Sequence, residues 1–394
     1  MQHGIILEDH IYISLYIYPI KSLRGTPISH ARITRHGLSY DRHFMLLKVE
    51  PDKSLRNMHV SVFNEMSLFR TDVIFPSESV EGKILVRYQA PVGHPDRDVV
   101  RELEVPLEPT DLETLRGIDV DMNSSASKAY DMGKKYSDWF TECFGFEVIL
   151  AYLGGNRRPV LGNISPNAVG KQPRASGSDS ATGWLSSITK AVPYLGNGAS
   201  SEDDERITFA DVAAYLVISE ASLQNVSSRL PENEPMDITK FRPNIVLSGP
   251  VEAFDEDFWG EVTVKDSIKF NLTSNCARCL SINIDYDTGT QGSGESGSVL
   301  KKLMKDRRVD QGMKYNPVFG RYGFIDKGSE GAIVTVGDEA VVSKRNEERT
   351  KFCRLNPRPF FVSLGENMVK TDSIIQIGRN CQADLVRGFP VIFG

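Results

Sequence analysis

The chain lacks any apolar run of ~18 residues, which is the length that a membrane-spanning helix needs. Residues 1–9 contain two acidic residues and no Lys or Arg, and no long apolar stretch follows them. This pattern is typical of neither a secretory signal nor a transit peptide. We therefore expect no transmembrane segment and no cleaved leader.

Cysteine is scarce: the 394 residues include five, and Cys143, Cys353 and Cys381 stand alone in the sequence. An odd, scattered set argues against a disulfide framework and favours a reducing compartment. A closed zinc site is not expected either, because it needs four ligands and no pair of histidines has ligand spacing.

Excess positive charge is also absent, since the net charge is -6. A general nucleic-acid binder would carry a basic face, so we expect no nucleic-acid partner. The stretch Gly292–Gly297 matches G-x-G-x-x-G, but residues 286–291 separate it from the preceding predicted strand. A dinucleotide site needs its first glycine directly after a strand, so we interpret this stretch as a loop.

What is present is a chain of ordinary globular composition, 40% apolar and 25% charged, long enough for two or three domains. Alternation and β-branched residues predict strands at 11–18, 31–34, 42–49, 73–75, 83–88, 146–153, 215–218 and 245–248. Apolar spacing predicts helices over 127–140 and 299–308, and another that begins after Ser219 as N-cap. The sequence therefore predicts a β-rich α+β protein.

One short motif favours reactive chemistry. Cys276 and Cys279 flank Arg278 and precede an alternating run, 280–285, that resembles a strand. A neighbouring cation stabilises a thiolate, which is both a nucleophile and a metal ligand. The motif thus favours metal ligation or sulfur chemistry, although two buried cysteines acting as small apolar side chains would explain it equally well. A thioredoxin-like dithiol would open a helix instead.

Three distant segments each place a cation at a predicted strand end or turn. They contain Lys21 with Ser22, Arg42 after Asp41, and Arg242 with Asn244. These side-chain types hold phosphates, so together they predict an anion pocket. Each one alone is more often a solvated charge or an ion-pair partner.

Six short segments occur in the order found in the MOSC family. They are Tyr18–Ser22, Gly37-Leu38 with Asp41-Arg42, Phe241–Asn244, Cys276–Cys279, Asp285 with Thr288-Gly289, and Pro317–Gly320. Across residues 11–345 the chain resembles this family, which takes its name from the C-terminal domain of molybdenum cofactor sulfurase. Within the family it is most similar to the amidoxime-reducing components and their fungal relatives.

The resemblance implies an N-terminal β-rich MOSC-associated domain (8–165) packed on a MOSC β-barrel domain (206–345) with peripheral helices. A flexible Ser/Gly-rich insertion (166–205) would separate the domains, and a tail (346–394) would follow them.

The resemblance also implies a molybdenum–molybdopterin cofactor, with Cys279 as the thiolate ligand of the metal and the catalytic residue. Cys276 would be its structural neighbour. The residues implied to bind the cofactor are Lys21, Ser22, Arg42, Asp211, Arg242, Asn244 and Arg278. Val212 and Ala213 stand where the family has hydroxyl residues, so some cofactor hydrogen bonds would be missing there.

By the same resemblance, the protein would reduce small N-hydroxylated substrates such as amidoximes and hydroxylamines with two electrons. A haem b cytochrome and an NADH-dependent flavin reductase would supply these electrons. Because the sequence shows no anchor or targeting segment, we expect a cytoplasmic protein. The alternatives are a sulfur carrier or cofactor-binding protein without turnover, and a non-catalytic interaction module.

Overall fold

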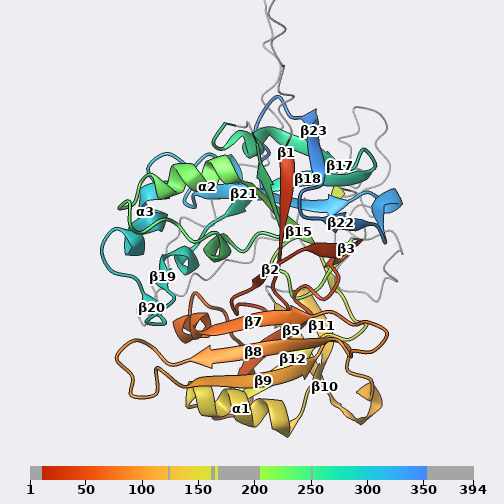
Figure 1. Ribbon diagram of the computed structural model, residues 1–394, viewed down its shortest axis with the longest axis vertical. Helices are drawn as coiled ribbons and strands as arrows, with labels where there is room; N and C mark the ends of the chain where they lie inside the picture. The colour runs from red at the N-terminus through yellow and green to blue at the C-terminus, as the bar shows by residue number, and fades with distance from the viewer. Residues whose placement is uncertain (1–10, 123–124, 161–164, 167–204, 250–251, 353–394) are drawn as a thin grey trace, which may run out of the picture.

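The computed structural model describes residues 11–122, 125–160, 165–166, 205–249 and 252–352 (Figure 1). These residues form two strand-rich bodies stacked along the long axis of the molecule. Most of the predicted insertion and of the predicted tail lie outside the described residues.

The upper body in Figure 1 is a closed ring of strands. Around the ring the order is β16 (Ile245–Ser248), β15 (Tyr215–Ser219), β21 (Val318–Ile325), β18 (Ile268–Ala277), β17 (Trp259–Val264), β23 (Glu339–Arg345) and β1 (Ile11–Ile17), with β2 (Thr26–Ile28) beside β1. The strand β1 closes the ring because it pairs with both β16 and β23. Its alternate residues Ile13, Leu15 and Ile17 are buried, as period-two alternation requires when one face of a strand meets a core.

The lower body contains two antiparallel sheets. One is built from β10 (Arg116–Met122), β11 (Ser125–Asp131), β12 (Val148–Tyr152), β5 (Phe44–Val49) and β6 (Leu55–Asn57). The other is built from β7 (Phe69–Ile74), β8 (Lys83–Gln89) and β9 (Val100–Pro106). Helix α1 (Lys134–Phe144) covers them, and its residues Phe140 and Phe144 pack on the ring of Phe69.

Short elements connect the two bodies. The small sheet of β3 (His30–Thr34) and β4 (Gly37–Leu38) includes β22 (Ile333–Thr335), a strand from far along the chain. β13 (Arg158–Pro159) pairs with β14 (Arg206–Ile207), and β19 (Ile284–Asp285) with β20 (Thr290–Gln291). Helices α2 (Glu220–Ser227) and α3 (Val299–Leu303) lie outside the barrel. Because β1 and β2 belong to the barrel sheet, the first residues described lie in the body that the C-terminal half completes.

Several local predictions are confirmed and three need correction. Ser219 caps α2 as predicted, since its side chain accepts a hydrogen bond from the backbone of Ser222. The helix predicted over 127–140 is wrong, because 125–131 is strand β11 and the helix begins at Lys134. Strand pairing along all of β10 overrides the helix-like apolar spacing there. The helix predicted over 299–308 ends at Leu303.

The third correction concerns the run after Cys279. Leu280–Asn283 is a 3-10 helix, and the strand of this motif is β18, which contains Cys276 and ends at Ala277. Ile282 and Ile284 are buried, whereas Leu280 is exposed, so the alternating run is not one strand with a buried face.

The predicted fold class is confirmed: an N-terminal β domain is packed on a β-barrel with peripheral helices. Among the described residues, no helix has both the length and the apolar character needed to cross a membrane.

Candidate active site

Four residues between the two bodies adopt left-handed backbone conformations that side chains normally avoid. They are Ser22, Tyr40, Arg42 and Arg242, with φ between 55° and 70°. Such conformations cost free energy and cluster at ligand-binding sites, where the surrounding contacts enforce them. Three of the four are residues that the sequence predicts to bind the cofactor.

Arg42 joins the two bodies. Its guanidinium contacts Asp41 and donates to Asn244 Oδ1 at 3.2 Å and to the carbonyl of Arg242 at 3.0 Å. The Asn244 side chain also accepts from the backbone N–H of Leu216. The predicted residues Arg42, Arg242 and Asn244 therefore meet, although about 200 residues separate them in sequence.

Tyr18 lies between two of these cations. The Arg42 and Arg242 guanidinium groups stand 4.9 Å and 4.6 Å from the centre of its ring. Its hydroxyl is buried without a hydrogen-bond partner among the described residues, and burial raises the pKa of Tyr18. Buried polar atoms are rarely left unpaired in folded proteins, so an orphan here indicates a missing partner.

Arg242 also has a nitrogen without a hydrogen-bond partner among the described residues. One nitrogen, Nη1, donates to the carbonyl of Leu23 at 2.8 Å. The other, Nη2, is buried and has no partner among the described residues. Burial and the nearby Arg42 lower the pKa of Arg242, so the site favours an additional negative charge.

Lys21 is buried and held by Asp211. Its Nζ donates to the carbonyl of Phe209 at 3.1 Å and contacts the Asp211 carboxylate. Burial lowers the pKa of Lys21 to about 8, although Asp211 opposes this shift. Burial, with Lys21 nearby, also lowers the pKa of His59 to about 4, so that imidazole adds no positive charge at neutral pH.

The two residues that follow Asp211 face the protein interior. Ala213 belongs to the barrel core, and Val212 packs against it. The apolar residues at these two positions thus contribute packing where the family's pattern has hydroxyl groups.

The two cysteines of the motif differ in environment. Cys276 is 2% exposed, and burial raises the pKa of its thiol. Cys279 is exposed, and its Sγ lies 3.2 Å from Ser281 Oγ. Only the second cysteine therefore presents its sulfur to a ligand.

Arg278, between the cysteines, is turned away from solvent. Its guanidinium donates to the carbonyl of Phe319 at 2.9 Å and 2.6 Å and to the carbonyl of Phe241 at 2.7 Å. The two phenylalanine rings stack with their centres 3.9 Å apart. In this structure Arg278 links β21 to the segment that carries Arg242.

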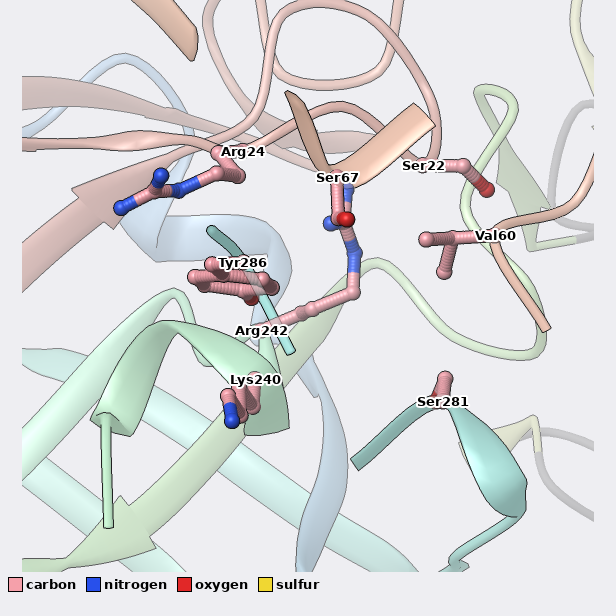
Figure 2. A pocket seen from close by; sticks show the side chains of 8 residues that line it. All are labelled: Ser22, Arg24, Val60, Ser67, Lys240, Arg242, Ser281 and Tyr286. Carbon is pink, nitrogen blue, oxygen red and sulfur yellow. The ribbon is translucent and has the colours of Figure 1, made fainter. Parts of the chain in front are cut away.

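A pocket lies where these segments converge, and Figure 2 shows its lining. It is lined by Ser22, Arg24, Val60, Ser67, Lys240, Arg242, Ser281 and Tyr286. The lining includes three cations and no carboxylate. The buried hydroxyl of Ser67 also lacks a hydrogen-bond partner among the described residues. This pocket therefore fits an anionic ligand with hydrogen-bond acceptors.

The side chains that the structure describes do not form a metal site by themselves. Among the described residues, no three His, Cys, Asp or Glu side chains are grouped to hold an ion. A metal at Cys279 would consequently need further ligands from a cofactor.

Comparison with known families agrees with this arrangement. Residues 11–147 match the MOSC N-terminal beta barrel domain, and residues 204–341 match the MOSC domain. The chain belongs to the MOSC family.

Several MOSC proteins are similar over most of the chain. Mitochondrial amidoxime reducing component 2 of Macaca fascicularis is 26% identical, over 79% of this chain and 78% of the relative. Mitochondrial amidoxime-reducing component 1 of Mus musculus is 27% identical, over 78% of this chain and 76% of the relative. Molybdenum cofactor sulfurase of Bos taurus is 24% identical, over 78% of this chain and 30% of the sulfurase.

The structure brings most of the predicted residues into one region. Ser22, Arg42, Arg242 and Asn244 surround the pocket or support its wall, whereas the guanidinium of Arg278 is bound to backbone. The prediction from sequence missed the pocket residues listed here: Arg24, Ser67, Lys240, Ser281 and Tyr286. A signal existed for Arg24 and Lys240, because each stands within three residues of a predicted phosphate-binding cation.

Proposed function

We propose that this MOSC protein binds a molybdopterin-type molybdenum cofactor and reduces N-hydroxylated substrates such as amidoximes. The observation that carries the proposal is the cation-lined pocket, with its orphan Arg242 nitrogen, beside the exposed thiol of Cys279. The relatives named amidoxime-reducing components support the same activity.

Different residues of the chain would bind the phosphate, support the pocket wall and ligate the metal. Ser22 and Arg242, which line the pocket, and the buried Lys21 next to Ser22 in sequence would hold the cofactor phosphate, with Arg242 Nη2 as an unpaired donor. Arg42 and Asn244 would hold the Arg242 segment in place through their hydrogen bonds. Cys279 would ligate the metal, and Ser281 would orient its sulfur from 3.2 Å away.

When bound, the cofactor would supply a metal that changes oxidation state by two electrons. The overall reaction breaks the N–O bond of an amidoxime, consumes two electrons and two protons, and releases the amidine and water. The two electrons would come from an external donor. We propose a haem b cytochrome and an NADH-dependent flavin reductase as the source, and a cytoplasmic location for the protein.

A second candidate is transfer of sulfur or cofactor by Cys279 without substrate turnover. The similarity to molybdenum cofactor sulfurase, 24% identical over 78% of this chain, favours it, as does the exposure of the thiol.

Molybdenum content, measured by elemental mass spectrometry, tests the proposal on protein from a host that makes the cofactor. We expect near-stoichiometric metal in the native protein and in the Cys276→Ala control, and loss of metal in Cys279→Ala. Benzamidoxime should then oxidise a reduced b-type cytochrome only when the native protein is present. Folded native protein without molybdenum would refute the proposal. Bound metal with no turnover of benzamidoxime or hydroxylamine would favour the transfer function.

A further inference from the structure

Two of the three cations that line the pocket are assigned no contact with the cofactor in the proposed function. Arg24 stands just before β2, and Lys240 belongs to the 3-10 helix Ile238–Phe241. Their charged groups lie on the two faces of the Tyr286 ring, 4.3 Å and 5.2 Å from its centre (Figure 2). Each is only partly exposed, and burial lowers the pKa of both, although nearby acidic groups oppose the shift. The ring therefore holds two positive charges close together.

Neither cation is paired directly with a described carboxylate, although Asp237, Asp285 and Asp287 favour their charged forms from farther away. No described carboxylate lies within ion-pair distance of either group, and neither charged group makes a hydrogen bond to a described residue. Paired positive charges that are partly withdrawn from water repel each other and favour a bound anion.

The same three residues separate two spaces. Arg24, Lys240 and Tyr286 line the pocket that also contains Ser281, and they line a second, larger space that is open to solvent. A substrate that approaches Cys279 through the larger space passes the two cations before it reaches Ser281.

Three carboxylates that also line the larger space already have partners. Asp237 accepts from the backbone and side chain of Thr239, and Asp285 accepts from two backbone N–H groups. Asp287 pairs with Arg97 at 3.0 Å. A negative group of a ligand would therefore bind at the two cations, which have no ion-pair partner among the described residues.

We propose that Arg24 and Lys240, held on Tyr286, form a subsite for an anionic group of the substrate, a carboxylate or a phosphate, next to the reaction centre. The subsite makes this protein selective for N-hydroxylated compounds with a negative group at a distance from the N–O bond. Naming the ligand as a substrate rests on the proposed function; the binding of an anion does not.

Two matched compounds test the subsite: benzamidoxime, which is neutral, and 4-carboxybenzamidoxime. Their binding to cofactor-loaded protein without an electron donor can be measured by calorimetry, separately from turnover. We expect the native protein to bind the carboxylated compound about tenfold more tightly, because a carboxylate gains charged hydrogen bonds there. Inorganic phosphate should compete with that compound and leave the binding of benzamidoxime unchanged.

The double variant Arg24→Gln with Lys240→Gln should lose the preference for the carboxylated compound. A control that removes two exposed cations elsewhere, Lys135→Gln with Lys344→Gln, should keep the preference. In turnover, the double variant should raise KM for the carboxylated compound about tenfold more than KM for benzamidoxime.

Equal binding of the two compounds by native protein would overturn the subsite, and so would a preference that survives in the double variant. Loss of molybdenum and pterin from the double variant would assign the two cations to the cofactor and also overturn it. Preferential binding without turnover of either compound would support the subsite while the proposed function fails.

Discussion

Replacing Arg278 with lysine should destabilise the protein even when no cofactor is bound. The guanidinium is 7% exposed and makes three hydrogen bonds, two to the Phe319 carbonyl and one to the Phe241 carbonyl. A lysine keeps the positive charge but lacks the planar fork, so it reaches one carbonyl at most. The other carbonyl then stays buried and unpaired.

The size of the effect follows from these contacts. A hydrogen bond from a charged donor contributes about 1.5–3 kcal/mol, and two are lost. Partial relaxation of the stacked Phe241 and Phe319 rings would recover some of this energy, so we expect a loss of about 3–5 kcal/mol. That is a large part of the stability of a typical domain.

Urea unfolding of cofactor-free protein, followed by tryptophan fluorescence, measures this loss directly. Arg116→Lys is a suitable control, since Arg116 forms an exposed ion pair with Asp131 and should contribute less than about 1 kcal/mol. If Arg278→Lys unfolds like the native protein and only its molybdenum content falls, the structural role is refuted. Arg278 would then be a cofactor-binding residue, as the resemblance implies.

Three further predictions concern other parts of the molecule. Because the Lys21 pKa of about 8 makes its charge disappear as pH rises through 8, retained molybdenum should fall above pH 8 in native protein and stay low at every pH in Lys21→Gln. Burial raises the pKa of Glu256 to about 7, so unfolding releases a proton between pH 4.5 and 7. The free energy of unfolding should therefore fall by about 3 kcal/mol as pH rises across that range. Denaturant titration at each pH should show no such slope for Glu256→Gln, and an unchanged slope would contradict the raised pKa of Glu256. Gly289 has φ of 65°, and a Cβ there would stand 2.8 Å from Leu68 Cγ. Gly289→Ala should therefore lower the free energy of unfolding by about 1–3 kcal/mol, and an unchanged Tm would disprove this strain.

The sequence pattern predicted correctly those elements that depend mainly on neighbouring residues. The alternation over Ile11–Ile17 predicts a strand with one buried face, and Ser219 predicts a helix start, because strand pleat and N-capping depend on neighbouring residues. The same reasoning failed over 127–140, where the pairing of β11 with β10 decides the outcome. It failed again after Cys279, where burial of Ile282 against the barrel side produces a 3-10 turn.

The sequence by itself determined which residue types were available: Lys21, Ser22, Arg42, Arg242 and Asn244 for an anion site, and Cys279 as a thiol. Only the tertiary structure decided how they are used. Burial of Arg278 between Phe241 and Phe319 directs its donors to backbone carbonyls, and tertiary packing places Arg24 and Lys240 on Tyr286. Sequence spacing does not encode these outcomes, because the partners lie tens to hundreds of residues apart and meet only when both bodies have folded.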